Sequence, residues 1–463
     1  MLEQELLNYT KSNAYPFHMP GHKRQDSFGA DPYQLDITEI HGFDNLHQPE
    51  GLLLEMMEKA ACLYGSRKSY LLVNGSTVGN LAAIYSATTQ GGSIIVGRNC
   101  HKSVYHGVEL RQLKVCYTNP TVSSRGIILG TPIEEYKRAI EECPHAQAVV
   151  VTSPTYEGMV EPLDEIVKMA HEHHMAVIVD AAHGAHFPFH KEFPDSPLES
   201  GADIVVMSLH KTLPALTQTA LLHIHKDSQI KEDVVQRYLS MFETSSPSYV
   251  LLVSVGKCLD FLEQREEAFS SYVDKLKEFY AGCEQLQHLS VVCQPHQDMG
   301  KIIINTGGAD ISGYELQKRL REEDGIELEM ASFYYGLAMS SVMDTREGFR
   351  RLLQGLIRID ASCQTRQRDG FMMADLYQAP RKEMELHEAA AMDKEICSWE
   401  EALGKVAGDM ISLYPPGVPL LVPGEIITER SLQILKQAME EGLQVTGLRP
   451  VATGKKGILV VVN

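Results

Sequence analysis

The segment M-A-V-I-V-D-A-A-H-G-A-H, residues 175–186, gives the clearest indication of the fold class. It runs through small and β-branched apolar residues to Asp180, as expected for a strand that is buried on both faces of a parallel sheet. A helical pattern at residues 162–173 precedes it, and this pairing is typical of an α/β unit. Because ligands of open α/β sheets bind at the carboxyl ends of the strands, Asp180 is predicted to lie at a binding site, although an ordinary loop aspartate remains an alternative.

Helical and strand-like patterns alternate on both sides of this unit and predict a mostly parallel sheet covered by helices. We expect four parts: an N-terminal segment (1–50), a large domain (51–265), a small α+β domain (266–370) and a C-terminal domain (371–463). In the last part we expect a charged helix near residues 384–401 and a rigid, proline-rich extended segment at residues 414–425.

Composition narrows the class of protein. The 463 residues carry 61 acidic and 42 basic side chains, a formal net charge of −19, so a nucleic-acid partner is not expected. The acidic balance favours cationic small molecules, or it serves solubility alone. The nine cysteines form no C-x-x-C pair and are interpreted as reduced, mostly buried side chains. No signal peptide or membrane span is predicted, and we expect a cytoplasmic protein.

A second motif, N-G-S-T-V-G-N at residues 74–80, joins a predicted strand to a predicted helix. The free N–H groups of a helix N-terminus, with the hydroxyls of Ser76 and Thr77, form a suitable phosphate cradle. A simple Ser/Thr helix cap is the alternative.

A third motif, S-L-H-K-T at residues 208–212, follows the predicted strand 204–207. Lys211 lies just beyond the strand end, where partial desolvation lowers the pKa of a lysine and makes its amine nucleophilic. A solvated surface lysine is the alternative. Together the three motifs supply what pyridoxal 5'-phosphate needs: an anion cradle, an acid for the ring nitrogen, and a lysine for the aldehyde.

With these motifs in view, the chain resembles the bacterial Orn/Lys/Arg decarboxylases, which have the fold-type-I architecture of aspartate aminotransferase. Shared segments include F-H-M-P-G-H-K (17–23), N-C-H-K-S (99–103) and T-S-S-P-S-Y (244–249), besides the motifs already quoted. The resemblance implies a large, mostly parallel seven-stranded sheet with smaller α+β C-terminal domains. It also implies a pyridoxal-phosphate-dependent decarboxylase of arginine, lysine or ornithine, active in polyamine-related metabolism. Members of this fold type are homodimers with active sites at the subunit interface.

The resemblance also implies residue roles. Lys211 would bind the aldehyde, Asp180 would pair with the ring nitrogen, and His101 and Ala182 would pack on the two faces of the ring. The expected catalytic residues are Lys211, His101 and Asp180. The other expected cofactor contacts are Ser76, Thr77, Ala182, His183, Ser208, His210, Thr244, Ser245 and Ser246, the last three reaching the partner subunit's site. His18, Lys23 and Glu425 are the expected substrate contacts, and for Glu425 a surface position is an equal alternative.

Two departures from the family pattern stand out. The chain has Asp-Ala-Ala-His at residues 180–183 where the family often has Asp-Glu-Ala-His, and about fifty residues precede the large domain, too few for the N-terminal wing of the longer members. We therefore expect dimers rather than wing-built decamers.

Other functions are also compatible with the sequence. An aminotransferase, with Arg358 holding the substrate carboxylate, a desulfurase and a non-catalytic pyridoxal-phosphate-binding paralogue are the alternatives. The histidine groups 171–174 and 183–190 do not match zinc ligand sets, and no metal is expected.

Overall fold

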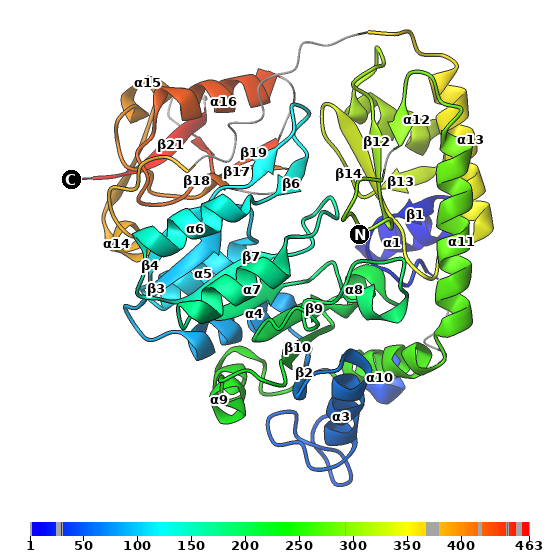
Figure 1. Ribbon diagram of the computed structural model, residues 1–463. Helices are drawn as coiled ribbons and strands as arrows, with labels where there is room; N and C mark the ends of the chain where they lie inside the picture. The colour runs from blue at the N-terminus through cyan, green and yellow to red at the C-terminus, as the bar shows by residue number, and fades with distance from the viewer. Residues whose placement is uncertain are drawn as a thin grey trace.

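The computed structural model describes residues 2–24, 29, 31–291, 293–366, 379–414, 419–440, 442, 444–450 and 456–462. Its centre is a seven-stranded sheet in the order β2-β10-β9-β8-β7-β3-β4 (Figure 1). In chain order the strands are β2 (Lys68–Leu72), β3 (Ser93–Gly97), β4 (Lys114–Thr118), β7 (Ala146–Thr152), β8 (Ala176–Asp180), β9 (Ile204–Ser208) and β10 (Ala220–Ile224). The five strands from β9 to β4 are parallel and β10 is antiparallel to both neighbours, which confirms the expected mostly parallel sheet.

Helices bury this sheet, as the apolar strand sequences require. Every residue of β9 and β10 is buried. Helix α4 contacts β2, β8, β9 and β10, and it packs beside α5 and α9, whereas α7 contacts β8 and packs beside α6. The bounds of the helices in this part of the chain are α2 (Pro32–Leu35), α3 (Leu52–Tyr64), α4 (Gly75–Ala87), α5 (Lys102–Leu110), α6 (Ile133–Glu142), α7 (Leu163–Glu172), η1 (Phe187–Phe189), α8 (Leu209–Thr212) and α9 (Glu232–Phe242).

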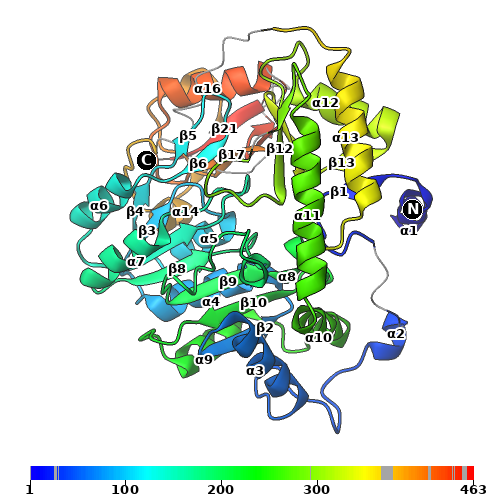
Figure 2. The ribbon, with the colours of Figure 1, turned by 45° about the vertical axis from the view of Figure 1, so that its right-hand side comes forward.

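A smaller antiparallel sheet, β11-β12-β15-β14, follows the large one and lies beside it. Helices α10 (Tyr249–Glu263) and α11 (Glu266–Cys283) lead to it, and Figure 2 shows α11 standing upright between strand β12 and helix α13. Its strands are β11 (Ser290–Val291), β12 (Lys301–Asn305), β14 (Met330–Ala331) and β15 (Tyr335–Met339), with α12 (Gly313–Asp324) and α13 (Arg346–Asp360) packed together.

The N-terminal segment is tied to this smaller unit. After α1 (Leu2–Lys11), strand β1 (Tyr15–Phe17) pairs in parallel with β13 (Ile326–Leu328). Phe17 is fully buried, and its ring packs edge-on against Phe349 of α13. The loop that follows β1 therefore leaves the small unit on its way to the large one.

Two three-stranded sheets make up the C-terminal part: β16-β21-β20 and β18-β17-β19. The element bounds are β16 (Lys394–Cys397), β17 (Ile411–Tyr414), β18 (Pro419–Leu421), β19 (Gln444–Thr446), β20 (Arg449–Pro450), β21 (Lys456–Val461), α14 (Leu386–Ala391), α15 (Trp399–Ala402) and α16 (Glu429–Glu440). The hairpin β5 (Thr121–Val122) and β6 (Ile128–Gly130) of the large domain shares their apolar core through Val122 and Ile128.

The expected charged helix at residues 384–401 is wrong. The segment is a short helix, the strand β16 and a second short helix, because β16 pairs with β21 sixty residues later. Of the proline-rich segment 414–425, residues 415–418 lie outside the described residues, and residues 419–421 form β18 as an extended strand.

Two kinds of feature are absent from the described residues. No helix in this part of the chain is both long and apolar enough to cross a membrane. Nor do the residues that the structure places include a group of three or more His, Cys, Asp or Glu side chains arranged to hold a metal ion.

Candidate active site

Asp180 lies at the carboxyl end of β8, in the middle of the large sheet. Its side chain is fixed at both oxygens: Oδ2 accepts a hydrogen bond from Asn80 Nδ2 at 2.8 Å, and Oδ1 accepts one from the Ala182 N–H at 3.1 Å. Asp180 is 4% exposed. A carboxylate held in this way at a sheet edge is oriented to meet a cationic or N–H donor.

Lys211 lies just beyond the carboxyl end of the neighbouring strand, β9. Strand β9 ends at Ser208, and the four-residue helix α8 places Lys211 one turn beyond it. Its Nζ lies 3.1 Å from His183 Nε2. Burial lowers the pKa of Lys211, and the charges of Asp180 and Glu329 offset part of this effect. The amine is therefore closer to its neutral, nucleophilic form than a solvated lysine would be.

A second lysine, which the sequence did not single out, reaches the same histidine. Lys301 Nζ lies 2.5 Å from His183 Nδ1, so His183 bridges two lysines. The Lys301 side chain is buried, and burial lowers its pKa to about 7. Lys301 begins β12 of the small sheet, and its position ninety residues from Lys211 gave no local motif that could have found it.

His101 is connected to Asp180 through two intermediates. Its Nδ1 lies 2.8 Å from Ser103 Oγ, and Asn80 Nδ2 donates to both Ser103 Oγ (3.0 Å) and Asp180. His101 is exposed and caps the N-terminus of α5, accepting a hydrogen bond from the Ser103 N–H. Its ring is thus anchored at one nitrogen with the remainder open to a ligand.

The predicted phosphate cradle is formed from two chain segments. Gly75, at φ +76°, turns the chain into α4, and the Asn74 side chain does not cap the helix. The N–H groups of this first turn are therefore available to an anion. Ser76 Oγ lies 2.6 Å from Ser208 Oγ, which joins this turn to the segment that carries Lys211. Thr77 is exposed beside it.

The remaining expected cofactor contacts lie in different surroundings. His183 and Ala182 are buried beside Asp180, and His210 Nδ1 lies 3.0 Å from the Thr219 carbonyl. The expected interface residues form the loop between α9 and α10, where Ser245 and Ser246 are exposed and the Thr244 carbonyl lies 2.9 Å from His47 Nε2. No described contact joins this loop to Lys211.

The loop at residues 18–23 borders the site through its backbone. The Gly21 N–H donates to the His210 carbonyl at 2.7 Å, and a Cβ on Gly21 would lie 2.8 Å from the Leu213 backbone. The Met19 N–H donates to Glu329 Oε2 at 2.8 Å. This close approach to α8 requires glycine at position 21.

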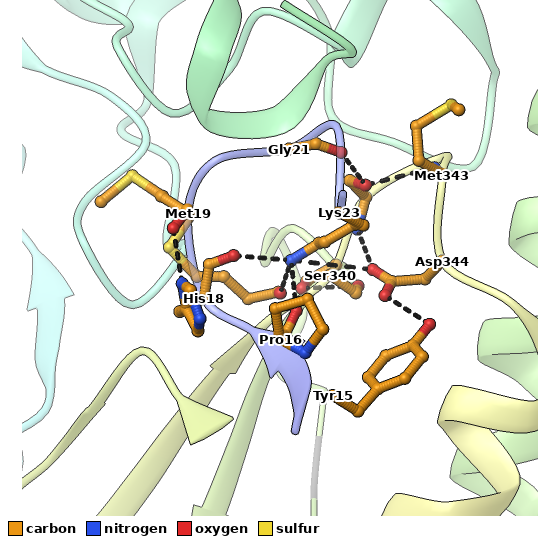
Figure 3. Close-up of polar contacts among 12 residues, drawn as sticks. Tyr15, Pro16, His18, Met19, Gly21, Lys23, Ser340, Met343 and Asp344 are labelled. Atoms are coloured by element: carbon orange, nitrogen blue, oxygen red, sulfur yellow. Dashed lines mark hydrogen bonds and ion pairs between the residues drawn. The ribbon is translucent and has the colours of Figure 1, made fainter. Parts of the chain in front are cut away.

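Lys23 has a structural role rather than the expected substrate contact. Its Nζ donates to the carbonyl oxygens of Pro16 (3.1 Å), His18 (2.9 Å) and Met339 (2.7 Å), which uses all three N–H bonds, and lies 3.8 Å from Asp344 (Figure 3). The side chain is 1% exposed. The His18 ring faces the N-terminal helix, where its Nε2 lies 2.9 Å from Tyr9 Oη.

Glu425 binds another side chain of the protein, Arg98, and the expectation that it binds substrate is corrected. Its oxygens form a two-point ion pair with Arg98 at 2.7 and 2.8 Å, and Oε2 accepts the Val422 N–H. The side chains of Arg98 and Glu425 are 0% and 2% exposed. Glu425 thus joins the C-terminal part to the large sheet, and no described contact brings it to Lys211.

The other expected site residues, around Lys211 and Asp180, have the chemistry that pyridoxal phosphate requires. An amine with a lowered pKa, a fixed carboxylate, an exposed imidazole and a hydroxyl-lined helix N-terminus converge on one edge of the sheet. These are the groups that the cofactor's aldehyde, ring nitrogen, ring face and phosphate require.

Comparison with known proteins agrees with this geometry. Residues 2–292 match the Orn/Lys/Arg decarboxylase major domain. The chain belongs to the Orn/Lys/Arg decarboxylase family. Residues 371–455 match the C-terminal domain of this decarboxylase family, which confirms the family expected from the motifs, and membership makes the chain an amino-acid decarboxylase.

Relatives of this Orn/Lys/Arg decarboxylase chain are found over nearly its whole length. The protein YaaO of Bacillus subtilis (strain 168) is 36% identical, covering 96% of this chain and 95% of its own. An arginine decarboxylase of Bacillus anthracis is 30% identical, covering 96% and 93%. Among solved structures, the Francisella novicida lysine decarboxylase LdcF superposes with a TM-score of 0.81 at 20% identity, covering 99% of this chain and 80% of its own. That structure confirms the expected fold class.

Proposed function

We propose that the protein decarboxylates a basic amino acid with pyridoxal phosphate as cofactor, and that arginine is its first candidate substrate. One observation carries the proposal: Lys211, with its lowered pKa, lies at the same sheet edge as the fixed Asp180 carboxylate. The preference for arginine rests on full-length relatives of 29–30% identity that are named arginine decarboxylases.

The proposed cofactor contacts follow from the chemistry of each group. The Lys211 amine would bind the cofactor aldehyde, Asp180 would keep the ring nitrogen protonated, and His101 would lie on the ring face. Ser76, Thr77, Ser208 and the first turn of α4 would hold the phosphate. When bound, the cofactor supplies an electron sink for the bond that breaks.

The chain's own residues have two further tasks in this scheme. Asn80 fixes Asp180 and, through Ser103, His101, so that the carboxylate and the imidazole keep one relative orientation. The Lys211 amine would also be placed to return a proton to the substrate carbon that loses its carboxylate.

We also propose a cytoplasmic homodimer with a role in polyamine-related metabolism. In that assembly the exposed Ser245 and Ser246 would complete the partner's phosphate site. A size measurement in solution with and without the cofactor tests the dimer.

A product assay tests the function. The purified protein with pyridoxal phosphate is incubated with arginine, lysine and ornithine in turn, and carbon dioxide, amine and keto acid are measured. We expect equimolar carbon dioxide and amine, fastest with arginine. Keto acid would instead support the aminotransferase alternative, and absence of turnover with every basic amino acid would contradict the proposal.

A further inference from the structure

We propose that Lys301 is a positioning residue which, through the His183 imidazole, holds the Lys211 amine neutral and exchanges one proton with it. The inference rests on the proposed function, in which Lys211 binds the cofactor aldehyde. Its basis is the bridge Lys211–His183–Lys301, with contacts of 3.1 and 2.5 Å at the two ring nitrogens.

The bridge limits the number of protons that the three groups can share. His183 is 6% exposed, and burial together with the two lysine charges holds its pKa well below the ordinary value, so the ring is neutral. A neutral imidazole has one N–H and one lone pair. When both contacts are hydrogen bonds, the lysine that faces the ring N–H must accept as a neutral amine, and the other lysine donates to the ring lone pair, most strongly as an ammonium.

The geometry assigns the ammonium to Lys301. Charge-assisted hydrogen bonds are the shorter ones, and the Lys301 contact with His183 is 0.6 Å shorter than the Lys211 contact. Lys301 Nζ also donates to Met339 Sδ at 3.4 Å. In this arrangement the Nε2–H of His183 donates to the lone pair of Lys211, whose amine is then neutral, as attack on a carbonyl carbon requires.

Charged groups surround both lysines. Asp180 and Glu329 favour the ammonium form of Lys211. Asp298, Glu329 and Glu157 favour that of Lys301, whereas burial and the Lys211 charge oppose it. The ring of Tyr156 lies beside both His183 and Lys301. Positive charge on His101 or His210 would further lower the pKa of His183. Because each lysine has acidic neighbours, a single positive charge is stabilised whether it lies on Lys211 or on Lys301.

The proposed proton exchange between Lys301 and Lys211 conserves both protons and charge. The Nζ–H bond of Lys301 breaks as an N–H bond forms at His183 Nδ1, and the Nε2–H bond of His183 breaks as an N–H bond forms at Lys211 Nζ. One positive charge moves from Lys301 to Lys211, and the imidazole changes tautomer but not charge. Lys211 would thereby gain the proton that its proposed role in the reaction requires.

The test measures the titration of Lys211 without the cofactor, so that it is independent of turnover. Full-length protein freed of carbonyl cofactor with hydroxylamine is trace-acetylated with acetic anhydride between pH 6 and 10. Peptide mass spectrometry then follows Lys211, with the exposed Lys168 as internal reference. We expect a midpoint for Lys211 well below that of Lys168.

Variants of Lys301 isolate its contribution. In Lys301→Met, loss of the nearby charge should raise the midpoint of Lys211 by about one unit, which slows its acetylation at pH 7 by roughly tenfold. Lys301→Gln should do the same, whereas Lys301→Arg, which keeps the charge, should leave the midpoint within a few tenths of a unit. Lys275→Met, which removes a partly buried lysine of α11 that binds the Asp344 carbonyl, should not move it.

Two results would overturn the proposal. One is an unchanged Lys211 midpoint in Lys301→Met or Lys301→Gln when circular dichroism shows native folding. The other is a wild-type midpoint for Lys211 equal to that of Lys168, which decides the question even if both neutral variants fail to fold. Either result leaves the proposed decarboxylation standing, because the product assay tests that separately.

Discussion

Arg98 and Glu425 form a buried two-point ion pair across 327 residues of sequence, with N–O distances of 2.7 and 2.8 Å. Arg98 lies just after β3 of the large sheet, and its guanidinium also faces the Tyr117 ring at 4.9 Å. The pair fastens the C-terminal part to the large domain. Its role is therefore to stabilise the fold.

Glu425→Gln should lower the free energy of unfolding by about 3–5 kcal/mol, because it leaves the Arg98 charge buried without a partner. Urea unfolding followed by circular dichroism measures this. A double-mutant cycle with Arg98→Met and Glu425→Leu should show a coupling of about 0.5–3 kcal/mol. Additive losses would contradict the pairing, and a raised KM for arginine in a fully stable Glu425→Gln protein would restore the substrate role.

Lys211→Ala should abolish the long-wavelength absorbance that pyridoxal phosphate acquires when bound to a lysine, and it should lower turnover by at least about 100-fold. The measurement is an absorbance spectrum of the protein after incubation with the cofactor and gel filtration. Lys168→Ala, on the exposed face of α7, is the matched control and should keep the band. Persistence of the band in Lys211→Ala would show that another lysine binds the aldehyde.

Asp180→Asn keeps a side chain of the same shape but removes the negative charge that we propose pairs with the ring nitrogen of the cofactor. We expect turnover to fall by about 10²–10⁴-fold and the dissociation constant of pyridoxal phosphate to rise. Steady-state kinetics and a fluorescence titration with the cofactor test this. Asp203→Asn is the control, since that buried carboxylate binds His171 and the Val177 N–H instead. Equal effects of the two variants would favour a merely structural role for Asp180.

Gly21→Ala should push the 18–23 loop away from α8, because the added Cβ would lie 2.8 Å from the Leu213 and Thr212 backbone. A clash of this kind costs about 1–3 kcal/mol, and it should weaken cofactor binding through the shift of Lys211. Thermal unfolding and a cofactor titration measure the two effects. In Gly256→Ala, on helix α10, the nearest atom would be Met56 Cε at 3.4 Å, so this control should be neutral or slightly stabilising. Gly21→Ala behaving like Gly256→Ala would refute the close approach.

His223 gives a pH-dependent stability. Burial lowers its pKa to about 3, and its Nδ1 lies 2.7 Å from Ser69 Oγ. The unfolded state, with an ordinary histidine pKa near 6.5, binds the proton first, so stability is lost as the pH falls below about 6.5. Between pH 7.5 and 5.5 the wild type should lose about 1.4 kcal/mol more than His223→Gln. Urea unfolding at both pH values tests this, and parallel losses would exclude the assignment.

Much of the fold was predictable because its signal is local. The helix predicted at 162–173 is α7 and the strand predicted at 204–207 is β9, each within one residue of the predicted bounds, because 3.6-residue spacing and continuous apolar runs are local features of the sequence. The error at 384–401 has the opposite cause. β16 is exposed at three of its four residues and exists through its pairing with β21, a long-range contact that leaves no local pattern.

The residues of the candidate site also differ in how far local sequence could predict them. The common position of Lys211, Asp180 and the 74–80 turn at one sheet edge could be predicted from local sequence, because each lies at the end of a buried strand and parallel strands bring their carboxyl ends to one edge. The partners of the other charged side chains could not be predicted, because they come from distant parts of the chain. Lys23 binds three carbonyls, Glu425 binds Arg98, and Lys301 joins the site from another sheet. A buried charge takes the partner that packing brings to it, and packing across domains is set by the whole chain.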